Sequence, residues 1–136
     1  MLSVTWTIER VHGADLDIGE VFEVYQSSGL GERRPSTDME RFGAMIRNAN
    51  LIVICRIEGK MTGIARSISD FSYVTYLSDM AVSRDHQRSG VGRALIEATQ
   101  KEAPQAKIVL LSAPAATGYY PHIGFSKHNS AWVLNP

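Results

Sequence analysis

The sequence has little of several features that mark particular protein classes. Its 136 residues include a single cysteine, Cys55, so no disulfide framework can form, and a cytoplasmic location is the expectation. No apolar run approaches the roughly 20 residues that span a bilayer. The N-terminus also lacks the basic and then apolar pattern of a signal peptide. We therefore expect neither a membrane protein nor a disulfide-stabilised one.

An excess of one charge sign is lacking as well. Fourteen Lys and Arg side chains balance fourteen Asp and Glu side chains. Proteins that bind nucleic acid or anionic membrane surfaces need a basic excess, so neither kind of partner is expected. Hydrophobic residues make up 44% of the chain, as in ordinary globular proteins. Its length predicts one domain over residues 1–136.

Hydrophobic periodicity predicts an α+β chain with the element order β-α-α-β-β-β-α-β-α-β. Strands are expected at Ser3–Glu9, Leu51–Ile57, Met61–Ser69, a segment ending at Val82 and Lys107–Ser112, and the last β of this order is a short hairpin of Phe125–His128 and Ala131–Leu134. Helices are expected at Asp15–Ser28, Thr37–Arg47, from Val91 to about Ala103, and in short form from Pro114 until Pro121 ends it. The helix from Val91 joins two strands, which predicts a right-handed crossover and a parallel pair beside three antiparallel strands.

Local signals define several element ends. Gly29 is expected to end the first helix, and Thr37 with Glu40 has the spacing of a capping box. Gly63 within a strand predicts a bulge or a close approach. The buried side of the second helix is predicted from apolar spacing to be Met39, Phe42 and Ile46.

The most informative stretch, Gln87-Arg88-Ser89-Gly90-Val91-Gly92, joins a strand to a helix. N–H groups in the first turn of a helix lack intrahelical partners and carry partial positive charge, so they can bind an anion. Gly90 and Gly92 remove the Cβ atoms that would block it, while Arg88 and Arg93 add charge-assisted donors. The turn is therefore predicted to bind a pyrophosphate.

Three phosphate-binding motifs can be compared with this turn. The P-loop motif requires Lys and then Ser or Thr after the second glycine, where Arg93 and Ala94 stand. The dinucleotide fingerprint requires a third glycine where Leu95 stands. The pattern Q/R-x-x-G-x-G does fit, and it resembles the acyl-CoA-binding motif of the GNAT superfamily of N-acetyltransferases. The resemblance implies the GNAT fold: a mixed, mostly antiparallel sheet with a parallel pair at the CoA cleft and about four flanking helices.

A second segment, residues 115–125, resembles the family pattern A-x-x-[FY]-Y-x-x-x-G-F. The match places Tyr120 where many members hold a tyrosine next to the CoA sulfur. Ala113 stands where the family often has an asparagine that contacts pantetheine, so that contact is not carried over. The alternative for Tyr120 is a core tyrosine with a satisfied hydroxyl.

Acetylation of an amine requires a neutral nucleophile and a stabilised thiolate. A primary amine with a pKa of ~10.4 is under ~0.1% neutral at pH 7, so a base or a water chain must take its proton. The thiol, with a pKa of ~8.5, is a stronger acid than tyrosine, with a pKa of ~10, so the thiolate is the weaker base. Tyr120 is therefore expected to act mainly as a hydrogen-bond donor to sulfur. The resemblance implies that the backbone N–H of Met80 or Val82 polarises the thioester carbonyl.

The identity of the base stays open. Asp79 is the only carboxylate in the central strand and can relay a proton through water if it faces the cleft. Side-chain alternation places Asp79 opposite to Met80 and Val82, and a structural role is the alternative. Other candidate bases lie in the predicted helices and link: Glu23, Glu32 and Asp38.

These patterns lead to one hypothesis with alternatives. The chain is predicted to transfer an acetyl group from acetyl-CoA to a primary amine of a small molecule or peptide, without a metal. Tyr120 and Asp79 are the predicted catalytic residues, and Met80, Val82 and residues 87–93 the predicted CoA site. The alternatives are a CoA-binding module without turnover, or an acyltransferase with another acyl-CoA or a hydroxyl acceptor. Homodimers are common in the family that the chain resembles. Arg33-Arg34 is expected in a solvated link, with contact to an acidic acceptor or to the CoA phosphates as the alternative.

Overall fold

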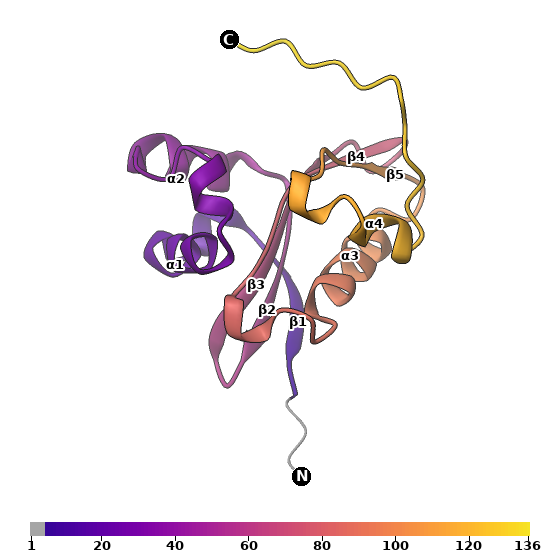
Figure 1. Cartoon of the computed structure of the whole chain (residues 1–136). Helices are drawn as coiled ribbons and strands as arrows, with labels where there is room; N and C mark the ends of the chain where they lie inside the picture. The colour runs from indigo at the N-terminus through magenta and orange to yellow at the C-terminus, as the bar shows by residue number, and fades with distance from the viewer. Residues whose placement is uncertain (1–4) are drawn as a thin grey trace.

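The computed structural model describes residues 5–136 and contains a five-stranded sheet with helices on both faces (Figure 1). The strands are β1 (Thr7–Val11), β2 (Leu51–Ile57), β3 (Lys60–Ser69), β4 (Val74–Val82) and β5 (Lys107–Val109), in the order β1-β2-β3-β4-β5. The helices are α1 (Ile18–Ser28), α2 (Met39–Asn48), α3 (Val91–Glu102) and α4 (Tyr119–His122), with single 3₁₀ turns η1 (Gly13–Asp15), η2 (Leu30–Arg33), η3 (Arg84–His86) and η4 (Pro114–Ala116). Strands β1 to β4 are antiparallel, and β5 lies parallel to β4 after the α3 crossover. The predicted α+β fold is confirmed.

Two apolar layers cover the sheet. Helices α1 and α2 lie on one face and α3 on the other (Figure 1). Strand β2 is buried on both faces, which explains its apolar run from Leu51 to Cys55. Ile52 and Ile54 pack toward α1 and α2, whereas Leu51, Val53 and Cys55 pack toward α3. No helix in residues 5–136 has the length and apolar character needed to cross a membrane.

The two N-terminal helices are capped by aspartates. Asp17 accepts hydrogen bonds from the first-turn amides of α1, and Gly29 ends that helix with φ of 88°, as predicted. The predicted capping box at Thr37 is wrong, because Asp38 caps α2 by accepting from the Arg41 N–H. The helix then begins at Met39, which is exposed rather than buried as predicted.

Two register shifts bend the central strands. One lies opposite Gly63, where an added Cβ would be 3.0 Å from side-chain atoms of both Val91 and Leu95. Gly63 thus lies at a bulge and also allows α3 to approach, as predicted. The second shift was not predicted: Leu77 pairs with Ser67, and Asp79 pairs with Arg66, so Ser78 is the extra residue.

The C-terminal predictions are partly wrong. Strand β5 ends at Val109 instead of Ser112, and Pro121 lies inside α4 rather than ending a helix that begins at Pro114. The predicted strands 125–128 and 131–134 are absent from the described residues, because alternating side chains without a neighbouring strand do not form a sheet. Strand β1 occupies Thr7–Val11 instead of 3–9, and residues 3 and 4 lie outside the described chain.

Candidate active site

The parallel strands β4 and β5 separate and leave a gap in the sheet. Their pairing covers only Val74–Tyr76 with Lys107–Val109, while β4 continues to Val82. The N–H of Ser83 donates to Thr62 on β3 at 2.8 Å. Because N–H groups alternate in direction along a strand, those of Val82 and Met80 point to the open side. These are the amides predicted to face the thioester carbonyl.

A cavity of about 150 Å³ lies at this gap. Its lining comes from β4, η2 and the segment after β5: Leu30, Arg33, Arg34, Leu77, Ser78, Met80, Leu110, Leu111, Ala113, Ala116, Tyr119 and Tyr120. A Cβ added at Gly92 would lie 3.0 Å from the Tyr119 hydroxyl and 3.4 Å from Met80 Cε. Since both of these side chains also line the cavity, it begins beside the first turn of α3.

The first turn of α3 has no side-chain cap. Within residues 5–136, no atom accepts a hydrogen bond from the backbone N–H groups of residues 88–93. Its N-cap is Gly90, with φ of 93°, and the first helical bond runs from the Ala94 N–H to the Gly90 carbonyl at 3.0 Å. In contrast to α1 and α2, no carboxylate fills the position in front of these amides, so an anion can.

Side chains of the predicted CoA turn mostly hold the turn itself. The Gln87 side chain donates to the Val82 carbonyl at 3.0 Å, and the Ser89 hydroxyl donates to the His86 carbonyl. Val91 is buried in the core below α3. Arg93 is paired with Glu97 at 3.1 Å, and Arg88 is exposed. Anion binding here would therefore depend on the main chain and on Arg88.

Tyr120 lines the cavity and is half-buried. Its ring packs edge-on against Tyr119 and Phe125, with ring centroids 5.3 and 5.4 Å away. Its hydroxyl has no hydrogen-bond partner among the described residues. It is also not one of the buried polar atoms that solvent cannot reach, so it is open to solvent in the cavity. Burial, and then the neighbouring Tyr119, raise the pKa of Tyr120. The hydroxyl is therefore protonated at neutral pH and available as a donor.

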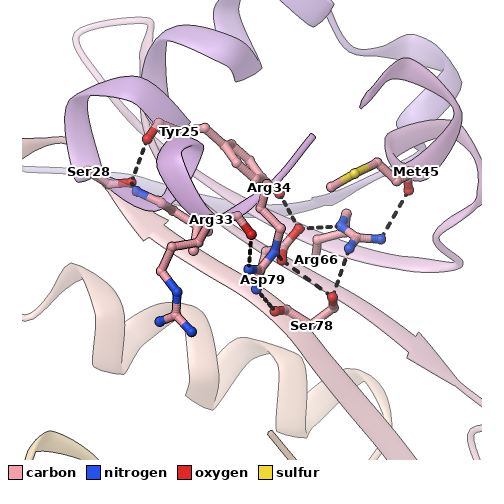
Figure 2. A network of polar contacts seen from close by, with 9 residues as sticks. Tyr25, Ser28, Arg33, Arg34, Met45, Arg66, Ser78 and Asp79 are labelled. Carbon is pink, nitrogen blue, oxygen red and sulfur yellow. Dashed lines mark hydrogen bonds and ion pairs between the residues drawn. The ribbon is translucent and has the colours of Figure 1, made fainter. Parts of the chain in front are cut away.

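Asp79 is 1% exposed and lies on the α1–α2 face of β4. Its carboxylate accepts hydrogen bonds from Arg34 Nε at 2.5 Å, Arg66 Nε at 2.6 Å and the Tyr25 hydroxyl at 2.6 Å (Figure 2). Burial alone would raise the pKa of Asp79, but the charges and hydrogen bonds of its partners, Arg66 above all, hold it below the usual value. A carboxylate with both oxygens engaged and a lowered pKa accepts protons poorly, so the geometry argues against the predicted relay.

The other candidate bases do not line the cavity that Tyr120 lines. Glu23 lines a separate cavity of about 240 Å³ beside α1, Asp38 caps α2, and Glu32 is exposed in η2. No carboxylate is found among the residues that line the Tyr120 cavity. Among residues 5–136, no three His, Cys, Asp or Glu side chains gather in a way that could hold a metal ion.

The prediction that Arg34 lies in a solvated link is wrong. Its side chain is only 24% exposed. Besides its ion pair with Asp79, the guanidinium donates hydrogen bonds to the Ser78 and Arg33 carbonyls at 2.8 and 2.9 Å. A carboxylate in a buried strand was a signal that cationic partners exist, because burying it unpaired is costly. The sequence could not identify which arginines they are.

An uncapped helix start that opens onto a cavity beside a short pair of parallel strands, in this mixed sheet, agrees with the acyl-CoA-dependent acetyltransferases that the motifs resemble. The sequence matches the family model described as the acetyltransferase (GNAT) domain over residues 22–135. The chain therefore belongs to the GNAT family, as its motifs predicted. A search of curated proteins gives no sequence match.

Solved structures share the fold at low sequence identity. A GNAT-family acetyltransferase from Streptococcus pneumoniae is 18% identical, with a TM-score of 0.76 over 97% of this chain and 100% of that chain. The aminoglycoside N-acetyltransferase AAC(6')-Iy, solved with CoA, is 16% identical, with a TM-score of 0.74 over 99% and 97%. An aminoglycoside acetyltransferase from an uncultured soil sample, solved with sisomicin, is 17% identical, with a TM-score of 0.69 over 96% and 95%.

Proposed function

We propose that the protein transfers the acetyl group of acetyl-CoA to a primary amine of a small molecule or peptide, by direct attack in a ternary complex. The observation that carries this proposal is the uncapped start of α3, whose unpaired amides adjoin the cavity lined by Tyr120. Two neighbours with similar folds are aminoglycoside acetyltransferases, which supports an amine acceptor.

The residues at the gap suit acetyl-CoA as co-substrate. Main-chain N–H groups of residues 88–93, with Arg88, would hold the diphosphate. Met80 and Val82 would direct their N–H groups to the thioester carbonyl, where negative charge develops during attack. Bound acetyl-CoA would supply the thioester, whose carbon–sulfur bond breaks as the carbon–nitrogen bond forms.

Tyr120 would donate a hydrogen bond to the departing sulfur. Its raised pKa favours donation over complete proton transfer, because the thiolate is the weaker base. The amine proton would pass to water, since the cavity has no lining carboxylate or histidine. Cys55 is an unsuitable acyl carrier, because it is fully buried and burial raises the pKa of its thiol. This favours direct attack over an acyl-enzyme.

Asp79 would act as a positioning residue. It fixes Arg34 against the cavity wall through the 2.5 Å contact with Nε. Its effect on catalysis would therefore come through the geometry of Arg34, without direct contact with the reacting atoms.

Substitution of Gly90 tests the predicted diphosphate site. Gly90→Val should raise the KM for acetyl-CoA several-fold, because a branched side chain would cover the free amides and disfavour φ of 93°. Gly59→Val is the matched control, since Gly59 also has positive φ, 79°, but lies in the β2–β3 turn. A folded Gly90→Val protein with unchanged KM would remove this assignment.

A turnover assay distinguishes an enzyme from a CoA-binding module. Calorimetry with acetyl-CoA, paired with a thiol-release assay over a panel of amines and alcohols, should show binding and release with an amine. Binding without release for any acceptor would favour the module, and release with alcohols alone would favour a hydroxyl acceptor.

We also propose a homodimer. Trp132 and Leu134 are 92% and 97% exposed, and the outer edge of β5 has no neighbouring strand in the described sheet. Exposed apolar side chains and a free sheet edge each favour association. Light scattering after size-exclusion chromatography should give twice the chain mass, and a monomer mass would contradict the proposal. The cytoplasmic location stays a prediction from the sequence.

A further inference from the structure

The cluster around Asp79 carries more positive than negative charge. One carboxylate meets two guanidinium groups, those of Arg34 and Arg66, and −1 + 2 leaves +1. Tyr25 adds no negative charge, because burial, and then the nearby Asp79, raise its pKa well above the usual value. Within residues 5–136, no other carboxylate forms an ion pair with either arginine.

The uncompensated charge lies on the cavity side. Arg66 is 9% exposed and directs its terminal nitrogens to the Met45 carbonyl and the Ser78 hydroxyl. Arg34 lines the cavity and uses three of its N–H groups, for Asp79, Ser78 and Arg33. A guanidinium has five such donors, so two remain.

Arg33 adds a second cation at the same cavity. Its guanidinium points away from the Asp79 cluster (Figure 2), and its side chain has no hydrogen-bond or ion-pair partner among the described residues. The cavity lining contains these two arginines and no acidic residue. Arg33 is exposed and Arg34 partly buried, so an anion placed here would lower the cost of the excess charge at Arg34.

The position distinguishes this anion from the phosphates of CoA. Arg33 and Arg34 follow α1, and α1 lies on the face of the sheet opposite to α3 (Figure 1), whereas the free amides lie at the start of α3. No residue of 88–93 lines the cavity, whereas both arginines and Tyr120 do. The arginines therefore share a cavity with the residue proposed to contact the CoA sulfur.

We propose that Arg33 and Arg34 bind a carboxylate of a substrate, which makes the acceptor an amine that also bears a carboxylate, or the donor a dicarboxylic acyl-CoA. This inference rests on the proposed function and deepens it. A planar guanidinium fork matches carboxylate geometry, and Asp79 holds Arg34 in place for it. The small cavity suits an acceptor of amino-acid size.

The test uses pairs of amines that differ only in a carboxylate or a carboxamide, each assayed with acetyl-CoA. The carboxylate form should have about tenfold to a hundredfold higher kcat/KM, the range expected for a charge-assisted hydrogen bond. Arg33→Gln should abolish this preference. Arg47→Gln should retain it, because Arg47 is exposed on α2 and lines neither cavity.

A second arm compares succinyl-CoA with acetyl-CoA on simple alkylamines. A preference for succinyl-CoA that Arg33→Gln removes would support the carboxylate site and assign it to the acyl donor. Equal use of both amine forms and of both acyl donors would overturn the proposal while leaving the transferase intact. An unchanged preference in Arg33→Gln would overturn it too.

A separate experiment distinguishes failure of the proposed function from failure of the carboxylate site. If the protein neither binds acetyl-CoA nor releases thiol, calorimetry with glutarate on wild type and Arg33→Gln tests the carboxylate site alone. Binding by wild type and loss of at least about tenfold in affinity in the variant would support the site. Absence of glutarate binding would overturn it.

Discussion

Replacing Asp79 with asparagine tests whether this carboxylate holds the cleft together or accepts a proton. Asparagine keeps the shape of the side chain but removes its charge. Arg34 and Arg66, now 2.5 and 2.6 Å from the carboxylate oxygens, would then lie side by side without an anion. Among the described residues, neither has another acidic partner to replace Asp79.

The expected effect on stability is large. Removing one partner of a buried ion pair costs about 3–5 kcal/mol, because the other charge stays buried and unpaired. Typical domains have only about 5–15 kcal/mol of stability in total. For a chain of this length, the loss corresponds to a melting temperature lower by about 10–20 °C.

Thermal unfolding monitored by circular dichroism at pH 7 measures this effect, and Arg34→Gln completes a double-mutant cycle. Arg34→Gln alone should cost about 1 kcal/mol, because the neutral Asp79–Arg66 pair remains. In the Asp79→Asn background it should cost nothing or restore stability, because it removes an unpaired cation. An Asp79→Asn protein that melts within about 2 °C of wild type but loses most of its kcat would refute this reasoning and favour the proton relay.

Three further outcomes follow from the same contacts. The stability advantage of wild type over Asp79→Asn should be complete above pH 4 and disappear as the pH falls through the lowered pKa of Asp79, which acid titrations of both proteins measure. Tyr120→Phe should lower kcat by about 10²–10⁴ with little change in acetyl-CoA affinity, as steady-state kinetics and calorimetry would show, whereas an equal kcat would make it a packing residue. Gly13→Ala should destabilise the fold by at least about 2 kcal/mol in thermal melts, because its Cβ would lie 2.0 Å from the Ile46 carbonyl oxygen, while Gly118→Ala, with nothing within 4 Å, should not.

Features that depend on local sequence were predictable. Strand β2 was placed at its observed ends because its apolar run is long and bounded by polar residues. The start of α3 was predicted from two glycines at a strand-to-helix junction, since few other residues leave first-turn amides open. Both signals lie within a few residues, so no tertiary contact was needed to read them.

Features that depend on distant partners were not predictable. Segment 131–134 alternates like a strand but finds no neighbouring strand in the described chain, and alternation cannot supply one. Arg34 is 45 residues from Asp79 in sequence and looks like any exposed basic residue before a proline. Its position is fixed by η2 and by β4, which the sequence gives no means of bringing together.

The extra residue in β4 connects the two halves of the proposed site. In a regular strand that kept Leu77 toward α3, Asp79 would also face α3 and Met80 would face α1. Because Ser78 is bulged, Asp79 instead faces α1 and meets Arg34 and Arg66. The Ser78 carbonyl also accepts from Arg34, and its hydroxyl accepts from Arg66. One register shift thus places Met80 beside the start of α3 and gives the opposite end of the cavity its positive charge.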